Sequence, residues 1–118
     1  MEKRRLGYTD LELSPVGLGT WAIGGGGWSF GWGPQDDEES VATIHHALKQ
    51  GVNWIDTAPV YGLGHSEKVV GRAIKGLREK VIIATKCGLV WDERGKISGR
   101  LKRESIRREV EELSLIHI

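Results

Sequence analysis

The chain has 118 residues, enough for one domain with a core of modest size. Its 17 Lys and Arg residues nearly balance its 16 Asp and Glu residues, so no basic surface indicates a nucleic-acid partner. No apolar run approaches the ~20 residues that a membrane-spanning helix needs, and we expect no membrane partner. The single cysteine, Cys87, excludes an internal disulfide and is compatible with a cytoplasmic protein. The oligomeric state is not indicated by the sequence.

The N-terminal segment combines a short hairpin with a loop rich in glycine and aromatic residues. Apolar residues on both sides of a turn-prone GYTD sequence predict a hairpin over residues 4–16. Residues 16–20 (VGLGT) predict a first buried strand, weakened by its glycines. Residues 24–34 follow as a loop, with four consecutive glycines and then two tryptophans and a phenylalanine.

A helix is predicted to begin at Asp36 or Asp37. Asp36 with Glu39 three residues later resembles a capping box, and acidic residues suit the positive end of the helix dipole. Apolar residues at helical spacing follow, and Gly51 is placed to end the helix. The next strand is predicted over residues 52–56.

The same order of strand, loop and helix then repeats. Ser66 is predicted to cap a second helix. Residues 81–85 (VIIAT) are uncharged and mostly β-branched, which predicts a strand buried on both faces. We expect a loop from residue 89 to residue 100 and then a third helix with Ile106 and Val110 on one side. Alternating strands and helices are typical of a parallel α/β fold.

Two charged residues follow neighbouring predicted strands. Asp56 ends one strand and Lys86 ends the next, 30 residues later (86 − 56), which matches one βαβ unit. The carboxyl ends of adjacent parallel strands lie ~5 Å apart at one edge of the sheet. Because α/β barrels and doubly wound sheets place their active sites at this edge, an acid and a lysine are expected to meet there.

Tyr61 follows Asp56 closely and completes a constellation with known chemistry. An ammonium group beside a phenol favours the phenolate, and a carboxylate beside the lysine holds the lysine charged. A tyrosine in this setting is suited to act as a general acid that protonates a carbonyl oxygen. From spacing alone, a purely structural role for Asp56, Tyr61 and Lys86 stays the more common interpretation.

Four segments of the chain resemble the aldo-keto reductase family. Residues 56–67 (DTAPVYGLGHSE) resemble the family signature D-T-A-x-x-Y-G-x-G-x-S-E. Residues 17–21 (GLGTW) resemble the first strand of the family, and residues 84–88 (ATKCG) resemble its lysine strand. Residues 4–7 (RRLG) resemble its opening hairpin. The segments occur in the family's order, and the similarity extends from about residue 4 to residue 112.

The resemblance implies a (β/α)8 TIM barrel, to which residues 1–112 contribute a leading hairpin and about three βα units. It implies an NADPH-dependent oxidoreductase that reduces small aldehydes and ketones to alcohols. It also implies that Tyr61 is the proton donor and that Asp56 and Lys86 tune it. The implied contacts with the nicotinamide end of the cofactor are Gly19, Thr20, Trp21 and Asp56. We find no spacing of metal ligands and expect no metal site.

Several alternatives stay open after this resemblance. The aromatic residues 24–33 either shape the substrate pocket or pack against the rim of the barrel. A non-catalytic binding or regulatory subunit with the same fold is an alternative function, because such subunits can retain the site residues. The chain begins close to the first strand of the family, which favours the enzyme. A half-barrel that assembles as an oligomer is a third possibility, and the abrupt C-terminus argues against it.

The length of the chain departs from the family pattern. A complete barrel needs roughly 250 residues, so the histidine that the family places after its fourth strand is not reached. Residues 113–118 (LSLIHI) match the translation of a transposase sequencing adapter, and we expect them to be non-native. His117 is therefore not expected to be the missing histidine. An incomplete barrel exposes an unpaired strand edge, so we expect the chain alone to be marginally folded, aggregation-prone and inactive.

Overall fold

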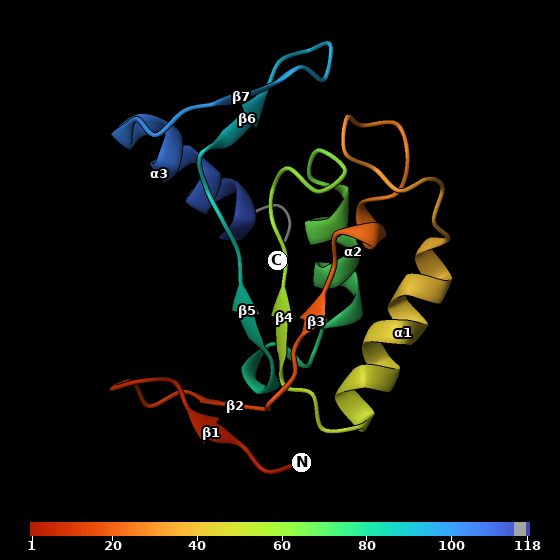
Figure 1. Cartoon of the computed structure of the whole chain (residues 1–118), viewed down its shortest axis with the longest axis vertical. Helices are drawn as coiled ribbons and strands as arrows, with labels where there is room; N and C mark the ends of the chain where they lie inside the picture. The colour runs from red at the N-terminus through yellow and green to blue at the C-terminus, as the bar shows by residue number, and fades with distance from the viewer. Residues whose placement is uncertain (115–117) are drawn as a thin grey trace.

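The computed structural model describes residues 1–114 and 118, and it places a parallel sheet beside two packed helices (Figure 1). The elements follow in the order β1 (Arg4–Arg5), β2 (Glu12–Leu13), β3 (Leu18–Gly19), the 3-10 helix η1 (Ala22–Gly24), α1 (Asp37–Lys49), β4 (Trp54–Asp56), α2 (His65–Ala73), the 3-10 helix η2 (Arg78–Lys80), β5 (Ile82–Ala84), β6 (Leu89–Trp91), β7 (Ile97–Gly99) and α3 (Arg103–Glu112). The predicted alternation of strands and helices is confirmed, as is the opening hairpin, in which β1 and β2 pair antiparallel.

The central sheet has the strand order β3-β4-β5, and both pairings are parallel. Asp56 at the end of β4 lies opposite Gly19 of β3 on one side and opposite Ala84 of β5 on the other. The predicted adjacency of the Asp56 and Lys86 strands is therefore confirmed. The carboxyl ends of the strands meet at one edge of the sheet, from which the loops that carry the candidate residues emerge (Figure 1).

Helix α1 has the ends that the sequence predicts. The Asp36 carboxylate accepts a hydrogen bond of 2.8 Å from the backbone N–H of Glu39, which satisfies one of the free donors of the first turn. At the other end Gly51 adopts φ 93°, a left-handed conformation that glycine tolerates, and its N–H donates to the carbonyl of Leu48.

The core lies between the sheet and the helix pair α1 and α2, which cover one side of the sheet (Figure 1). Burial of this apolar surface is the main favourable contribution to folding. Two histidines connect the helices: His45 Nε2 lies 2.7 Å from the carbonyl oxygen of Ala73, and His65 Nε2 lies 2.7 Å from Asp37 Oδ1. The buried residues of the core are Ile23, Ile44, Ile55, Val69, Val70, Ala73, Ile74 and Val81.

The prediction that Ser66 caps the second helix is wrong. Helix α2 begins at His65, its N-cap is Gly64, and no side chain caps it. Gly64 has φ 97°, which lets the chain turn sharply into the helix. Ser66 therefore lies inside the first turn, fully buried, and its hydroxyl bonds to residues from other elements instead.

The prediction of a loop from residue 89 to residue 100 is also wrong, because this segment forms the antiparallel hairpin β6–β7. The Asp92 carboxylate accepts hydrogen bonds from the backbone N–H groups of Arg94 and Lys96, which closes the turn between the strands. Helix α3 is present, but its buried residues are Ser105 and Glu109, not the expected apolar pair. Glu109 faces inward because its carboxylate accepts a hydrogen bond from the backbone N–H of Gly88 there.

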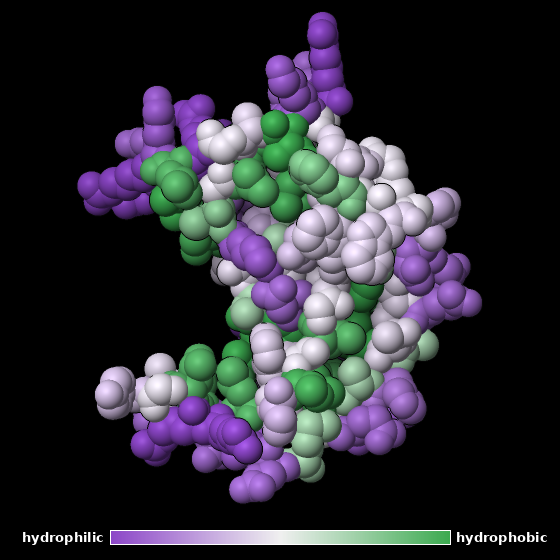
Figure 2. Space-filling view, in the orientation of Figure 1, coloured by the Kyte–Doolittle hydropathy of each residue, from purple (hydrophilic) through white to green (hydrophobic). Residues whose placement is uncertain are grey.

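Strand β5 is not buried on both faces, which corrects the prediction for residues 81–85. All residues of β5 are only half-buried, because β5 pairs with β4 and, within the described part of the chain, with no second strand. The molecule is hollowed on this side, and hydrophobic residues border the hollow (Figure 2). The open strand edge that we expected is therefore present.

Candidate active site

Lys86 and Asp56 form an ion pair at the carboxyl edge of the sheet. The Lys86 ammonium donates to both Asp56 carboxylate oxygens, each at 2.9 Å, and to the Thr57 carbonyl at 2.9 Å. The β4–β5 register sets this geometry, because it brings the segment after Ala84 alongside Asp56. The side chain of Lys86 is 47% exposed and that of Asp56 is 39% exposed, so the pair is open to solvent and to a ligand.

The environment of Lys86 favours its charged form. Burial lowers the pKa of Lys86, but hydrogen bonding to Asp56 and Tyr61 and the charges of both groups raise it by more. The net result is a pKa above the usual value of 10.5, so the ammonium is protonated at neutral pH. A fixed positive charge therefore stands at this edge of the sheet.

Tyr61 lies beside this charge. The Lys86 ammonium is 5.0 Å from the centroid of the Tyr61 ring, within the range of a cation–π contact. Tyr61 is buried, whereas the lysine is exposed. The structure thus brings together the three residues Asp56, Tyr61 and Lys86, as expected. An acidic hydroxyl beside a fixed cation can give a proton to a substrate oxygen.

Aromatic rings extend from Tyr61 toward solvent. Trp21 stacks on Tyr61 with a centroid distance of 5.4 Å, and Trp32 stacks on Trp21 at 6.4 Å. Trp28 contacts both Trp21 and Tyr61. Two indole groups hold the loop of residues 24–34. Trp21 Nε1 donates to the carbonyl of Phe30, and Trp28 Nε1 donates to that of Gly25. The aromatic loop therefore lies directly beside the candidate residues.

A cluster of buried hydroxyl groups holds the ends of the strands. It includes Ser66, which we had predicted to cap a helix. The Ser66 hydroxyl lies within hydrogen-bond distance of the Thr20 carbonyl at 3.0 Å, the Thr20 hydroxyl at 2.9 Å and the Thr57 hydroxyl at 3.2 Å. Thr20 also donates to the Asp56 carbonyl through both its backbone N–H and its hydroxyl, each at 3.0 Å. These contacts connect β3, β4 and α2 behind the ion pair. A signal was present, since Ser66 belongs to the DTAPVYGLGHSE motif.

The residues expected to contact the cofactor have different environments. Thr20 is fully buried, backbone included. Trp21 keeps 41% of its exposure. A Cβ atom added at Gly19 would meet open space beside Asp56, so a ligand can approach the backbone closely there. Gly19, Trp21 and Asp56 are thus the expected cofactor contacts that are at least partly open to a ligand.

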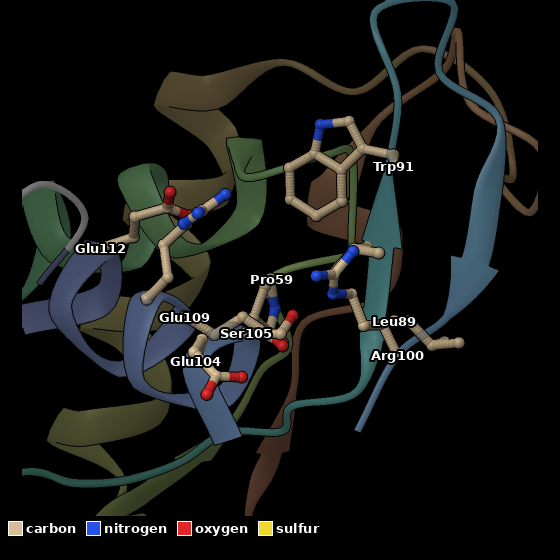
Figure 3. Close-up of a pocket in the computed structure, with 10 residues that line it drawn as sticks. Pro59, Leu89, Trp91, Arg100, Glu104, Ser105, Glu109 and Glu112 are labelled. Carbon is tan, nitrogen blue, oxygen red and sulfur yellow. The ribbon is translucent and has the colours of Figure 1, made fainter. Parts of the chain in front are cut away.

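Two cavities adjoin the site. A small one of about 90 Å³ is lined by Lys86, Cys87 and Glu109 with the loop that leads to Tyr61. A larger one of about 360 Å³ lies between α3 and the β6–β7 hairpin, with Trp91 and Arg100 on the hairpin side (Figure 3). Glu109, Pro59 and Leu89 line both cavities. Glu109 was not predicted from the sequence, because its contact with Gly88 is made across 21 residues of chain.

Two further searches concern the described part of the chain. Residues 1–114 and 118 contain no group of three or more His, Cys, Asp or Glu side chains that could hold a metal ion. None of the helices formed by these residues combines the length and the apolar character that crossing a membrane requires.

The model of the family described as aldo/keto reductase matches residues 15–114. The chain belongs to the aldo/keto reductase family. The fold is accordingly the N-terminal part of a (β/α)8 barrel, in which β3, β4 and β5 are neighbouring barrel strands.

Three relatives show how much of an aldo/keto reductase the chain represents. It is 47% identical to the NADH-specific methylglyoxal reductase of Escherichia coli (strain K12), over 93% of this chain and 36% of the relative. The glycerol dehydrogenase from Gluconobacter oxydans is 50% identical with a TM-score of 0.78, and the match covers 94% of this chain and 34% of the dehydrogenase. An aldo-keto reductase from Klebsiella pneumoniae, solved in complex with NADPH, is 28% identical with a TM-score of 0.65. This match covers 86% of this chain and 30% of the reductase. The chain thus spans about a third of the length of these relatives.

The C-terminal predictions stay predictions. The aldo/keto reductase match extends to residue 114, inside the segment 113–118 that we expect to be non-native. His117 lies outside the described residues, so the structure does not test whether it differs from the family's histidine. Ile118 is described, and its backbone N–H donates to the carbonyl of Leu113.

Proposed function

We propose that the protein of which this chain forms a part reduces small aldehydes and ketones to alcohols with a nicotinamide cofactor. The observation that carries the proposal is the Asp56–Lys86 ion pair, whose ammonium stands 5.0 Å from the ring of Tyr61. This is the arrangement of groups that carbonyl reduction needs at the substrate oxygen, where negative charge develops. Membership of the aldo/keto reductase family supports it.

Each side chain has a separate task in this proposal. The Tyr61 hydroxyl gives its proton to the carbonyl oxygen as general acid. The Lys86 ammonium stabilises the negative charge that remains on the phenol oxygen. Asp56 holds the ammonium with two hydrogen bonds and keeps it charged. The β4–β5 register places Asp56 and Lys86, and the rings of Trp21 and Trp28 pack against Tyr61, so little reorganisation is needed during the reaction.

The bound cofactor supplies a hydride to the carbonyl carbon. We propose that Asp56, Trp21 and the backbone around Gly19 and Thr20 hold its nicotinamide end. The proposed cofactor is NADPH, which the Klebsiella relative binds in its solved complex. The Escherichia coli relative is NADH-specific, so the choice has to be measured with both cofactors.

The aromatic loop is proposed to shape the substrate pocket. Trp32 is 78% exposed and stacks on Trp21, which in turn stacks on Tyr61. An exposed group of aromatic rings of this kind is typical of a binding surface. The loop is also held in place as a wall, because the Trp28 indole N–H donates to Gly25 within the loop and the Trp21 indole N–H donates to Phe30 from outside it.

The test replaces Tyr61 by phenylalanine in the complete protein encoded by this reading frame. Tyr61→Phe keeps the ring that stacks on Trp21 but removes the acid, so kcat should fall by about 10²- to 10⁴-fold. Oxidation of NADPH and of NADH is followed with a short aliphatic aldehyde and with methylglyoxal. Tyr8→Phe is the matched control, because Tyr8 is fully exposed on the opening hairpin.

Either of two results would contradict this proposal. Full activity of Tyr61→Phe would exclude the tyrosine as the proton donor. Cofactor binding without turnover by the unaltered protein would favour the non-catalytic regulatory subunit.

A further inference from the structure

The chain leaves the sheet just before Lys86. The last residue of β5, Ala84, accepts a hydrogen bond of 2.8 Å from the backbone N–H of Thr57. Beyond it the chain passes Lys86 and turns at Gly88, which is buried and has φ 101°. A Cβ atom at Gly88 would lie 2.5 Å from a Leu101 methyl carbon, so the turn is tightly packed. The position of Lys86 therefore depends on what holds this turn.

A side chain from α3 holds the turn. The backbone N–H of Gly88 donates to the Glu109 carboxylate, at 3.0 Å to Oε2 and 3.3 Å to Oε1. The carbonyl of Gly88 accepts from the N–H of Arg100 at 2.8 Å. Both polar groups of the glycine are thus satisfied, one of them by a carboxylate. A carboxylate that accepts a backbone N–H makes a strong, charge-assisted hydrogen bond.

Glu109 is built into the site. It is only 8% exposed, which is unusual for a glutamate. Its side chain projects from α3 toward Pro59 (Figure 3), and Glu109 lines the small cavity together with Lys86 and Cys87. Most other charged residues of α3 are exposed. The burial of this one carboxylate beside the lysine segment calls for a role in that segment.

We propose that Glu109 is a positioning residue for Lys86. Its carboxylate fixes the Gly88 turn, and the turn fixes the lysine against Asp56 and Thr57. Lys86 makes three hydrogen bonds of 2.9 Å, and bonds of this kind weaken steeply when their geometry is distorted. The inference rests on the proposed function, because it assigns Glu109 a role in placing the ammonium beside Tyr61.

Two conservative variants separate position from charge. Glu109→Gln keeps the length of the side chain and one acceptor oxygen but loses the charge. Glu109→Asp keeps the charge but withdraws the acceptor from Gly88 by one methylene group. If Glu109 acts by position, the glutamine variant is the more active of the two. If it acts only by its charge, the order is reversed.

The first measurement is kcat and KM of the complete protein with an aldehyde substrate. Glu109→Asp should lower kcat by about 10- to 100-fold, the size of effect that a small misplacement of a reacting group produces, while KM stays the same. Glu109→Gln should retain kcat within about threefold. Glu111→Asp is the control, because Glu111 is exposed on the same helix. Equal kcat of both Glu109 variants and the wild type would overturn the inference.

A second measurement does not depend on turnover. Acetic anhydride labels free amines, and mass spectrometry compares the labelling rate of Lys86 with that of exposed Lys75. In Glu109→Asp the ion pair should loosen and Lys86 should be labelled up to about tenfold faster, whereas Glu109→Gln should resemble the wild type. Unchanged labelling in Glu109→Asp would overturn the inference even if the protein reduces no carbonyl. Absence of turnover in the wild type would instead refute the proposed function.

Discussion

Strands β4 and β5 each contribute one partner of the ion pair, but they lie in different surroundings. Strand β4 has a neighbour on both sides, and its central residue Ile55 is fully buried. The corresponding residue of β5, Ile83, pairs with Ile55 but is only half-buried at the edge of the sheet. Asp56 thus emerges from the centre of the sheet, whereas Lys86 emerges from its edge.

The two strand ends are consequently held by different means. The backbone of Asp56 is fixed by Thr20, whose N–H and hydroxyl both donate to the Asp56 carbonyl. The segment around Lys86 is fixed by carboxylates from helices: Thr85 donates to Glu67 at 2.8 Å, and Gly88 donates to Glu109. A central strand is positioned by its neighbours, and an edge strand needs side chains from other elements.

The largest expected effect on the free energy of unfolding comes from replacing Ile55 of β4 or Ile83 of β5. In the complete protein, Ile55→Ala should lower the free energy of unfolding by about 2–5 kcal/mol, because it leaves a cavity in the core. If further strands of a (β/α)8 barrel cover β5 in the complete protein, Ile83→Ala should cost a similar amount. Urea denaturation measures both. A much smaller cost for Ile83→Ala would show that the edge of β5 stays open and would contradict the completed barrel.

The hydroxyl cluster behind β4 should give a smaller effect. Ser66→Ala removes the hydroxyl that bonds to Thr20 and Thr57 and leaves buried polar atoms without a partner. We expect a loss of about 1–3 kcal/mol in the free energy of unfolding. Ser29→Ala is the control, because Ser29 is exposed in the aromatic loop. Equal stability of the two variants would show that the strand ends do not depend on this cluster.

The features that the sequence predicted correctly are set by residues close together in the chain. The Asp36 cap and the Gly51 helix end each depend on groups within a few residues. The meeting of Asp56 and Lys86 is less local, but the βαβ repeat fixes it, because one repeat carries the chain to the adjacent parallel strand. Tyr61 follows Asp56 closely in the chain and was placed with this pair on that ground, and the resemblance to the aldo-keto reductases favoured its role as proton donor over a purely structural one.

The features that the sequence did not predict depend on tertiary contacts. Serine is a residue type that favours helix caps, but Ser66 lies inside the first turn of α2 and bonds to Thr20 across 46 residues of chain. Val110 is 57% exposed although it is apolar, because the inward face of α3 carries Glu109 for the Gly88 amide. The half-burial of β5 depends on which elements surround it. None of these contacts has a local pattern from which it could be predicted.

The smallest expected effect on the free energy of unfolding comes from the ion pair between Asp56, at the end of β4, and Lys86, after the end of β5. Burial lowers the pKa of Lys86, but Asp56 and Tyr61 raise it by more, so it lies above 10.5 in the folded protein. A raised pKa of a lysine means that its charged form stabilises the fold below about pH 10.5, and that this contribution is lost as the pH rises through the folded pKa. Because the side chain is 47% exposed, solvent screening keeps the contribution small.

The free energy of unfolding of the wild type and of Lys86→Met, measured across this range, checks the sign. The difference between the two proteins should be constant at neutral pH and should shrink above about pH 10.5. High salt should reduce it, because the pair is exposed. A difference that grows with rising pH would mean that the ammonium is destabilising in the folded state. The contact between β4 and β5 at the site would then oppose folding, and the strands would have to be held together by their backbone ladder and by the helices alone.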